Sequence, residues 1–116
     1  MKKNISVLLI ATALIFSATA VFAASGSSLF KSEGCIACHN INGNGQGGSV
    51  GPDLSHIGSK RSLSWIKTQI THPGAHFVSG TTANINGRSY RAIMPGNRHM
   101  AASKLNALAA YLESLK

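Results

Sequence analysis

Two stretches of the chain carry apolar residues at the spacing of one helix face, with polar residues between them. The first covers residues 62–71, where Ser62 or Ser64 can cap a helix and Pro73-Gly74 follows its end. The second covers residues 101–116, and its leucines follow one another at helical spacing: Leu105, Leu108, Leu112 and Leu115. We therefore predict one helix in each stretch.

The rest of the pattern predicts short elements and loops. Ser27 or Ser28 can cap a short helix over residues 29–34. Residues 40–51 are rich in Gly and Asn, which indicates a loop. Residues 75–92 show no convincing periodicity, so we expect a second long loop there. Together these patterns predict an all-α fold of three or more short helices joined by long loops.

The N-terminal part of the chain differs from the rest. Residues 5–24 form an apolar run broken only by Thr and Ser, and two lysines precede it. A basic start, an apolar run and a small-residue ending are typical of a secretory signal peptide. We expect cleavage of residues 1–23, which leaves residues 24–116 as one periplasmic domain. The alternative is an uncleaved anchor on the outer face of the inner membrane, since the run approaches the length of a membrane span.

Basic residues dominate the domain. Residues 24–116 hold nine Lys and Arg against Glu33, Asp53 and Glu113. Between Asp53 and Glu113 every charged residue is basic: Lys60, Arg61, Lys67, Arg88, Arg91, Arg98 and Lys104. A surface of one sign attracts a partner of the opposite sign, so we expect an acidic protein partner. The alternative is a solvated face that only keeps the protein soluble. No nucleic-acid binding is expected of an exported chain without a recognition motif.

The motif that carries chemistry is Cys35-Ile36-Ala37-Cys38-His39. Two thiols three positions apart lie on one side of a helical turn, so both can bond to one edge of a porphyrin while His39 binds the iron. This C-x-x-C-H spacing is the attachment signature of c-type haem. A thioredoxin-like dithiol would need a βαβ context, a zinc site would need further ligands, and a disulfide would leave His39 unexplained. We therefore expect one covalently attached haem c.

The composition of the domain agrees with a bound porphyrin. Residues 24–116 carry all 12 glycines of the chain and only five aromatic residues: Phe30, Trp65, Phe77, Tyr90 and Tyr111. So short a chain builds only a small hydrophobic core by itself. We expect the cofactor to supply part of the missing apolar mass.

The order of these motifs resembles a class I cytochrome c, the small soluble monohaem type of bacteria. C-x-x-C-H, a glycine-rich loop, Gly51-Pro52-Asp53-Leu54, a helix, a long loop, Met94-Pro95 and a last helix follow one another along nearly the whole domain. The resemblance implies a small cytochrome c-like fold wrapped around one haem. It also implies thioether bonds from Cys35 and Cys38 and axial iron ligation by His39 and Met94.

The resemblance suggests further contacts around the haem. It implies that the Pro52 carbonyl accepts a hydrogen bond from the proximal histidine, and that Lys60 or Arg61 holds a haem propionate. Trp65 lies off the apolar stripe of its predicted helix and has two interpretations. Its indole N–H can reach a propionate at the haem edge, or the ring is part of the core.

The sixth iron ligand has alternatives to Met94. Methionine is ordinarily a flexible core residue, and it is Pro95 and the place before the last helix that favour Met94. Met100 is the rival, although it falls where an apolar residue at the helix start is expected. Four histidines offer bis-histidine ligation instead: His56, His72, His76 and His99.

With both axial positions taken, no coordination position is open to a substrate, so we expect electron transfer rather than catalysis. The expected molecule is a monomeric periplasmic carrier without a small-molecule substrate. It would exchange one electron with acidic redox proteins, such as a membrane oxidase or reductase or a multihaem cytochrome. One alternative is a membrane-tethered electron-input subunit of such a complex, and another is a haem-based sensor or gas-binding protein. A peroxidase would need a distal acid–base pair, which we do not identify.

Overall fold

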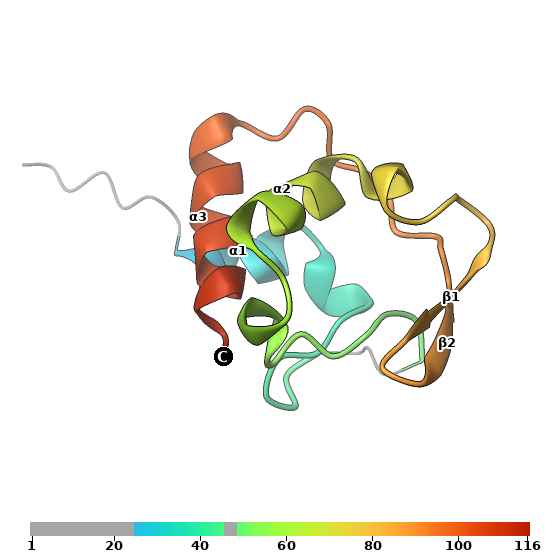
Figure 1. Ribbon diagram of the computed structural model, residues 1–116. Coiled ribbons are helices and arrows are strands. Elements are labelled where there is room, and N and C mark those ends of the chain that lie inside the picture. Colours follow the sequence, from blue (N-terminus) through green and yellow to red (C-terminus); the bar gives the residue numbers. More distant parts are fainter. Residues whose placement is uncertain (1–24, 46–48) are drawn as a thin grey trace, which may run out of the picture.

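The computed structural model describes residues 25–45 and 49–116 (Figure 1). The predicted signal peptide, residues 1–23, lies outside these ranges. Among the described residues no helix has the length and apolar character needed to cross a membrane. In Figure 1 the three α-helices lie together on one side, and a two-stranded hairpin lies on the other.

Helices make up most of the regular structure. The α-helices and single-turn 3₁₀ helices are α1 (Gly26–Ser32), η1 (Cys35–Ala37), η2 (Ile57–Ser59), α2 (Leu63–Thr71), η3 (Pro73–Ala75) and α3 (Ala102–Ser114). The predicted second and last helices are confirmed as α2 and α3. Ser62 caps α2 through a 3.2 Å bond from the Trp65 N–H to its hydroxyl. The first helix begins earlier than predicted because Ser25, not Ser27 or Ser28, is its cap.

The crossing of α1 and α3 forms the centre of the core. Gly26 lies so close to α3 that a Cβ there would collide with the side chain of Tyr111. Beside this contact Leu29 is 2% exposed and Leu108 is fully buried, so the two helices exclude water from their interface. The buried apolar cluster joins α1, α2 and α3: Leu29, Phe30, Ile41, Ile66, Ile70, Leu108, Ala109 and Leu112.

The C-terminal end of α3 is tied to η2. The Gly58 N–H donates to the Leu115 carbonyl at 2.7 Å, and Lys116 Nζ donates to the Gly58 carbonyl at 3.0 Å. His56 Nδ1 forms a 2.6 Å hydrogen bond with the carbonyl of Lys116. A Cβ at Gly58 would collide with the Glu113 carbonyl, so the close approach requires glycine. These contacts hold the loop before α2 against the helical side of the molecule.

A short hairpin replaces part of the loop that we predicted over residues 75–92. Strands β1 (Thr82–Ile85) and β2 (Arg88–Arg91) pair antiparallel around Asn86-Gly87. Both turn residues have positive φ, 52° and 78°, as the tightest hairpin turns require. The loop prediction was wrong here, because strands of four residues with one buried side chain, Tyr90, give almost no periodic signal. The described structure is mostly helical, as predicted, with this small sheet added.

Candidate functional site

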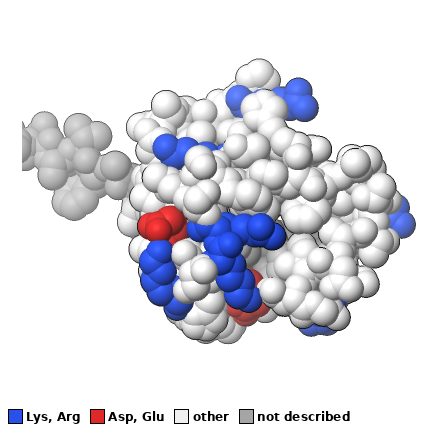
Figure 2. Space-filling model, in the orientation of Figure 1, with Lys and Arg blue, Asp and Glu red and all other residues white. Residues whose placement is uncertain are grey.

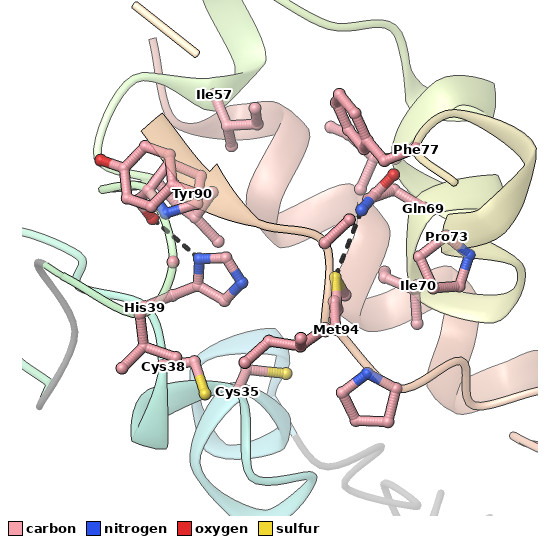
Figure 3. Close-up of a pocket in the computed structure, with 18 of the residues that line it drawn as sticks. Cys35, Cys38, His39, Ile57, Gln69, Ile70, Pro73, Phe77, Tyr90 and Met94 are labelled. Atoms are coloured by element: carbon pink, nitrogen blue, oxygen red, sulfur yellow. Dashed lines mark hydrogen bonds between the residues drawn. The ribbon is translucent and has the colours of Figure 1, made fainter. Parts of the chain in front are cut away.

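A cavity of about 300 Å³ gathers most of the residues that the sequence singled out (Figure 3). Its walls come from η1, the loop before η2, α2, the hairpin and the segment before α3. Most of the lining is apolar; the charged residues in it are Glu33, Arg61 and Arg91. The cavity therefore suits a large, mainly apolar group with a few polar attachment points.

Cys35 and Cys38 reach the cavity from a single turn of chain. Gly34, at φ 80°, ends the first helix and starts this turn. The N–H groups of Cys38 and His39 both donate to the Cys35 carbonyl, at 3.1 and 3.0 Å. Both cysteines are free thiols. Burial, the largest effect, raises the pKa of the Cys35 thiol and keeps it protonated.

His39 is fixed by its bond to Pro52. Its Nδ1 donates to the Pro52 carbonyl at 2.7 Å, which leaves Nε2 with a lone pair for a metal. Burial lowers the pKa of His39 by more than the bond to Pro52 raises it, so the ring is neutral, as a ligand must be. Gly51 leaves room for the ring, since a Cβ there would lie 2.7 Å from His39 Cε1.

The loop that carries Pro52 is braced from both sides. The Leu54 N–H donates to the Asn40 carbonyl at 2.8 Å, and the Asn42 N–H donates to Ser55 Oγ at 2.8 Å. Within the loop the Ser55 N–H donates to Asp53 Oδ1, also at 2.8 Å. The hydroxyl and the N–H of Ser55 lower the pKa of Asp53. The carbonyl that orients the imidazole thus belongs to a closed hydrogen-bonded turn.

Met94 lies across the cavity from His39, and in Figure 3 the two side chains face one another above the thiols of Cys35 and Cys38. Gln69 Nε2 donates a hydrogen bond to Met94 Sδ at 3.4 Å. Since a thioether can only accept a hydrogen bond, it is the amide nitrogen of Gln69 that faces the sulfur. Imidazole and thioether are a known ligand pair for haem iron.

The segment after Met94 is anchored to two helices. The Asn97 N–H donates to the Ile70 carbonyl at 2.9 Å, and Asn97 Nδ2 donates to Glu33 Oε2 at 3.2 Å. Lys104 forms an ion pair with the same carboxylate at 3.5 Å. Gly96 lies so near α2 that a Cβ would be 2.6 Å from the Thr71 carbonyl. These contacts hold the segment that follows Met94 in place and so fix the position of Met94 in the cavity wall.

The rival sixth ligands are placed less favourably. Met100 reaches the cavity lining but packs against the helical core at the start of α3. The four other histidines do not line the cavity: His56, His72, His76 and His99. His72 and His99 are exposed, His56 bonds the Lys116 carbonyl and His76 bonds Gln69.

Lys60, Arg61 and Trp65 were expected near the haem propionates. Trp65 lines the cavity and stacks on His76, and the Arg61 guanidinium lies 4.4 Å from the centre of its ring. Arg61 also lines the cavity, whereas Lys60 lies in a neighbouring groove beside Arg88. Of the two basic residues that we considered for a propionate, Arg61 is the one at the cavity.

Among the cavity residues that sequence reasoning missed, three bear on the site: Gln69, Tyr90 and Phe77. Gln69 is four positions after Trp65 and shares its helix face, a spacing that marks neighbours. Tyr90 comes from the hairpin, and the Asn86-Gly87 pair is the signal that predicts such a turn. Phe77 follows η3 and lies edge-on to Trp65, with ring centres 6.4 Å apart. No sequence pattern points to Phe77.

The residues around the cavity fit a covalently attached haem. The donor set consists of two free thiols, one neutral imidazole nitrogen and one thioether, within mostly apolar walls. A zinc site does not fit, because among residues 25–45 and 49–116 no cluster of three or more His, Cys, Asp or Glu residues could hold a metal ion. The donors support a haem iron, whose equatorial ligands come from the porphyrin itself.

Comparison with known proteins agrees with this chemistry. The family model described as cytochrome c matches residues 23–116. Neither curated proteins nor solved structures gave a significant match.

Proposed function

The chain belongs to the cytochrome c family, whose members bind haem c covalently and transfer electrons with it, and from this premise we propose that it is a periplasmic one-electron carrier with His39 and Met94 as axial ligands. The expected haem c and the resemblance to cytochromes c are thereby confirmed. The observation that supports the ligand pair is the arrangement in Figure 3, where imidazole and thioether face one another across one cavity.

Each residue of the site has a definite task. Cys35 and Cys38 hold the cofactor through two thioether bonds at the cavity end nearest α1. His39 presents Nε2 because its Nδ1–H is engaged by Pro52. Met94 presents its sulfur from the opposite wall. With His39 and Met94 both bound to it, the iron would have no position open to a substrate or a small gas.

The surroundings of the site favour electron exchange. Haem c, when bound, supplies an iron that takes up and releases one electron. Apolar walls keep water away from the iron ligands. This burial and the thioether ligand both favour a high reduction potential. Arg61 and Trp65 line the cavity, and a guanidinium and an indole N–H are suited to bind the propionates.

Positive charge around the cavity supports an acidic partner. Arg61 and Arg91 line the cavity, and Lys60 and Arg88 line the groove beside it together with Asp53, so basic residues outnumber acidic ones in both places. Glu33, the carboxylate in the cavity lining, is paired with a lysine. Figure 2 shows blue side chains gathered where the start of α2 meets the C-terminal end of α3. Small, salt-sensitive encounters of this kind suit a carrier that must bind and leave quickly.

Two exposed apolar residues belong to the chain segments that line the cavity. Val78 is 69% exposed and Ile93, the neighbour of Met94, is 55% exposed. Exposed apolar side chains of this kind are a suitable contact for a transient redox complex. The periplasmic location rests on the sequence of residues 1–23.

Two matched variants test the ligand pair in the exported haem protein. In Met94→Ala the thioether-to-iron absorption of the ferric form should disappear, because the sulfur is gone. In Met100→Ala the band should remain, since that side chain packs on the core. Retention in Met94→Ala together with loss in Met100→Ala would move the ligand to Met100. Absence of the band from the unmodified protein would refute thioether ligation.

A further inference from the structure

The wall behind Met94 holds a row of polar and aromatic side chains that the ligand assignment does not use. Arg61, Trp65 and Gln69 are spaced four residues apart and lie along one side of α2 and the turn before it. The η3 turn folds the chain back so that His76 meets this row. We propose that His76 is a positioning residue that holds the amide of Gln69 with its nitrogen toward the Met94 sulfur. This inference rests on the proposed ligation by Met94.

The contacts form one continuous series. Gln69 Nε2 lies 3.4 Å from Met94 Sδ, and Gln69 Oε1 lies 2.9 Å from His76 Nδ1. The His76 ring stacks on Trp65 with ring centres 4.2 Å apart and an interplanar angle of 5°. The Arg61 guanidinium lies 4.4 Å from the centre of the Trp65 ring. Each member is thus held by the next, from Gln69 at the Met94 sulfur to Arg61 at the other end.

The chemistry of the amide explains why such a series matters. A glutamine side chain can turn its NH₂ group or its oxygen toward a neighbour at little intrinsic cost. Only the NH₂ group can donate a hydrogen bond to the thioether sulfur. The amide oxygen would instead place its lone pairs against those of the sulfur, which is repulsive. A hydrogen on His76 Nδ1 can bond only to the oxygen of Gln69, so it selects the orientation that points the NH₂ group at Met94.

Stacking keeps the imidazole where this selection requires it. Residues 73–75 of η3 bring His76 back over the helix, with the His76 N–H donating to the Pro73 carbonyl at 3.0 Å. Parallel stacking on Trp65 then restricts rotation of the ring about its Cβ–Cγ bond. Its Nδ1 stays directed at Gln69.

A hydrogen bond to the sulfur has an electronic consequence. Donation from Gln69 draws electron density from Met94 and weakens its bond to ferric iron more than to ferrous iron. Loss of the bond should therefore lower the reduction potential. It should also make Met94 harder to displace from the ferric form. Simple loosening of the pocket would do the opposite and make displacement easier.

Three variants of the exported haem protein separate these effects. His76→Phe keeps a flat ring on Trp65 but removes the Nδ1 donor. His76→Asn loses the ring, but asparagine Nδ2 is two covalent bonds from Cβ, as histidine Nδ1 is, and can still donate to Gln69. His72→Phe is the matched control, since His72 is an exposed histidine of the same segment. The measurements are the midpoint potential and the affinity of the ferric form for added imidazole.

We expect His76→Phe to lower the potential and to weaken imidazole binding about threefold to tenfold, the usual weight of one net hydrogen bond. His72→Phe should stay close to the unmodified protein in both measurements. His76→Asn should fall between the unmodified protein and His76→Phe, because it keeps a donor for Gln69 but loses the stacking on Trp65. An unchanged potential in His76→Phe, or tighter imidazole binding, would overturn the role of His76. So would a loss in His76→Asn equal to that in His76→Phe.

The ferric spectrum separates the failure of this inference from failure of the proposed ligation. If the unmodified protein lacks the thioether-to-iron band, Met94 is not the ligand and both proposals are overturned. If the band is present but His76→Phe behaves as the control does, only the positioning role is wrong.

Discussion

Gly51 is the position where a single added methyl group tests how tightly His39 is held. A Cβ at Gly51 would lie 2.7 Å from His39 Cε1, 2.9 Å from Nδ1 and 2.9 Å from the Cys38 carbonyl. Carbon atoms in contact normally lie about 3.5–4.0 Å apart. In Gly51→Ala the imidazole or the loop must therefore move by roughly 1 Å.

The cost of this movement follows from what the ring contacts. Displacement stretches the 2.7 Å bond to the Pro52 carbonyl, since Gly51 and Pro52 approach the same edge of the imidazole. Overpacking of a well-filled site costs about 1–3 kcal/mol. For a domain of this size 1 kcal/mol corresponds to roughly 4–8 °C in Tm. We expect Gly51→Ala to lower the Tm by about 5–20 °C.

Thermal unfolding of the ferric haem protein, followed by circular dichroism, measures this change. Gly74→Ala is the matched control, because Gly74 lacks a positive φ and no atom lies within 4 Å of a Cβ built there. The control should change the Tm by much less. If Gly51→Ala were as stable as Gly74→Ala, the close packing of Gly51 against the His39 ring and the Cys38 carbonyl would be refuted.

Three further outcomes follow from the contacts around the site. Glu33→Ala should lower the free energy of unfolding in urea by about 1 kcal/mol, because the Asn97 side chain loses its acceptor. Glu33→Gln keeps an acceptor and should cost little, since the ion pair that it removes is with Lys104, which is 55% exposed. Equal losses in the two variants would contradict the anchoring of the Met94 segment by Asn97. Electron delivery to an acidic redox protein, measured by stopped flow, should slow as ionic strength rises, and a rate indifferent to salt would remove the steering argument. The pKa of Asp53 is lowered in the fold, so its contribution to stability is present above its ordinary pKa of about 4 and is lost as the pH falls below it. Acid titration of unfolding should therefore be less steep for Asp53→Asn than for the unmodified protein, and identical titrations would show that the Ser55 contacts do not favour the carboxylate.

The sequence was sufficient where a local pattern determines the structure. The isoleucine and leucine spacings gave α2 and α3 because each helix buries one face against the others. The C-x-x-C-H motif gave the cofactor because thioether attachment needs that spacing. The pairing of His39 with Pro52 was expected from the order of the motifs, and the structure has that bond at 2.7 Å.

The remaining features depend on contacts between distant segments. The hairpin was missed because its short strands bury only Tyr90, and the Asn86-Gly87 turn was not used as evidence. The hydrogen bond between Gln69 and His76 was missed because it depends on how far the chain folds back after Pro73. A helix pattern shows which residues share a face, but it does not show which distant side chain, such as Met94, packs against that face.

The proposed function depends above all on an iron closed on both sides by side chains of this chain. Exposure of the reduced haem protein to carbon monoxide at neutral pH tests this directly, because the gas binds only where an axial position is open. We predict that the absorption spectrum of the unmodified protein stays unchanged, and that Met94→Ala binds the gas readily. Ready binding by the unmodified protein would contradict axial closure by Met94 and would favour a sensor or gas-binding protein.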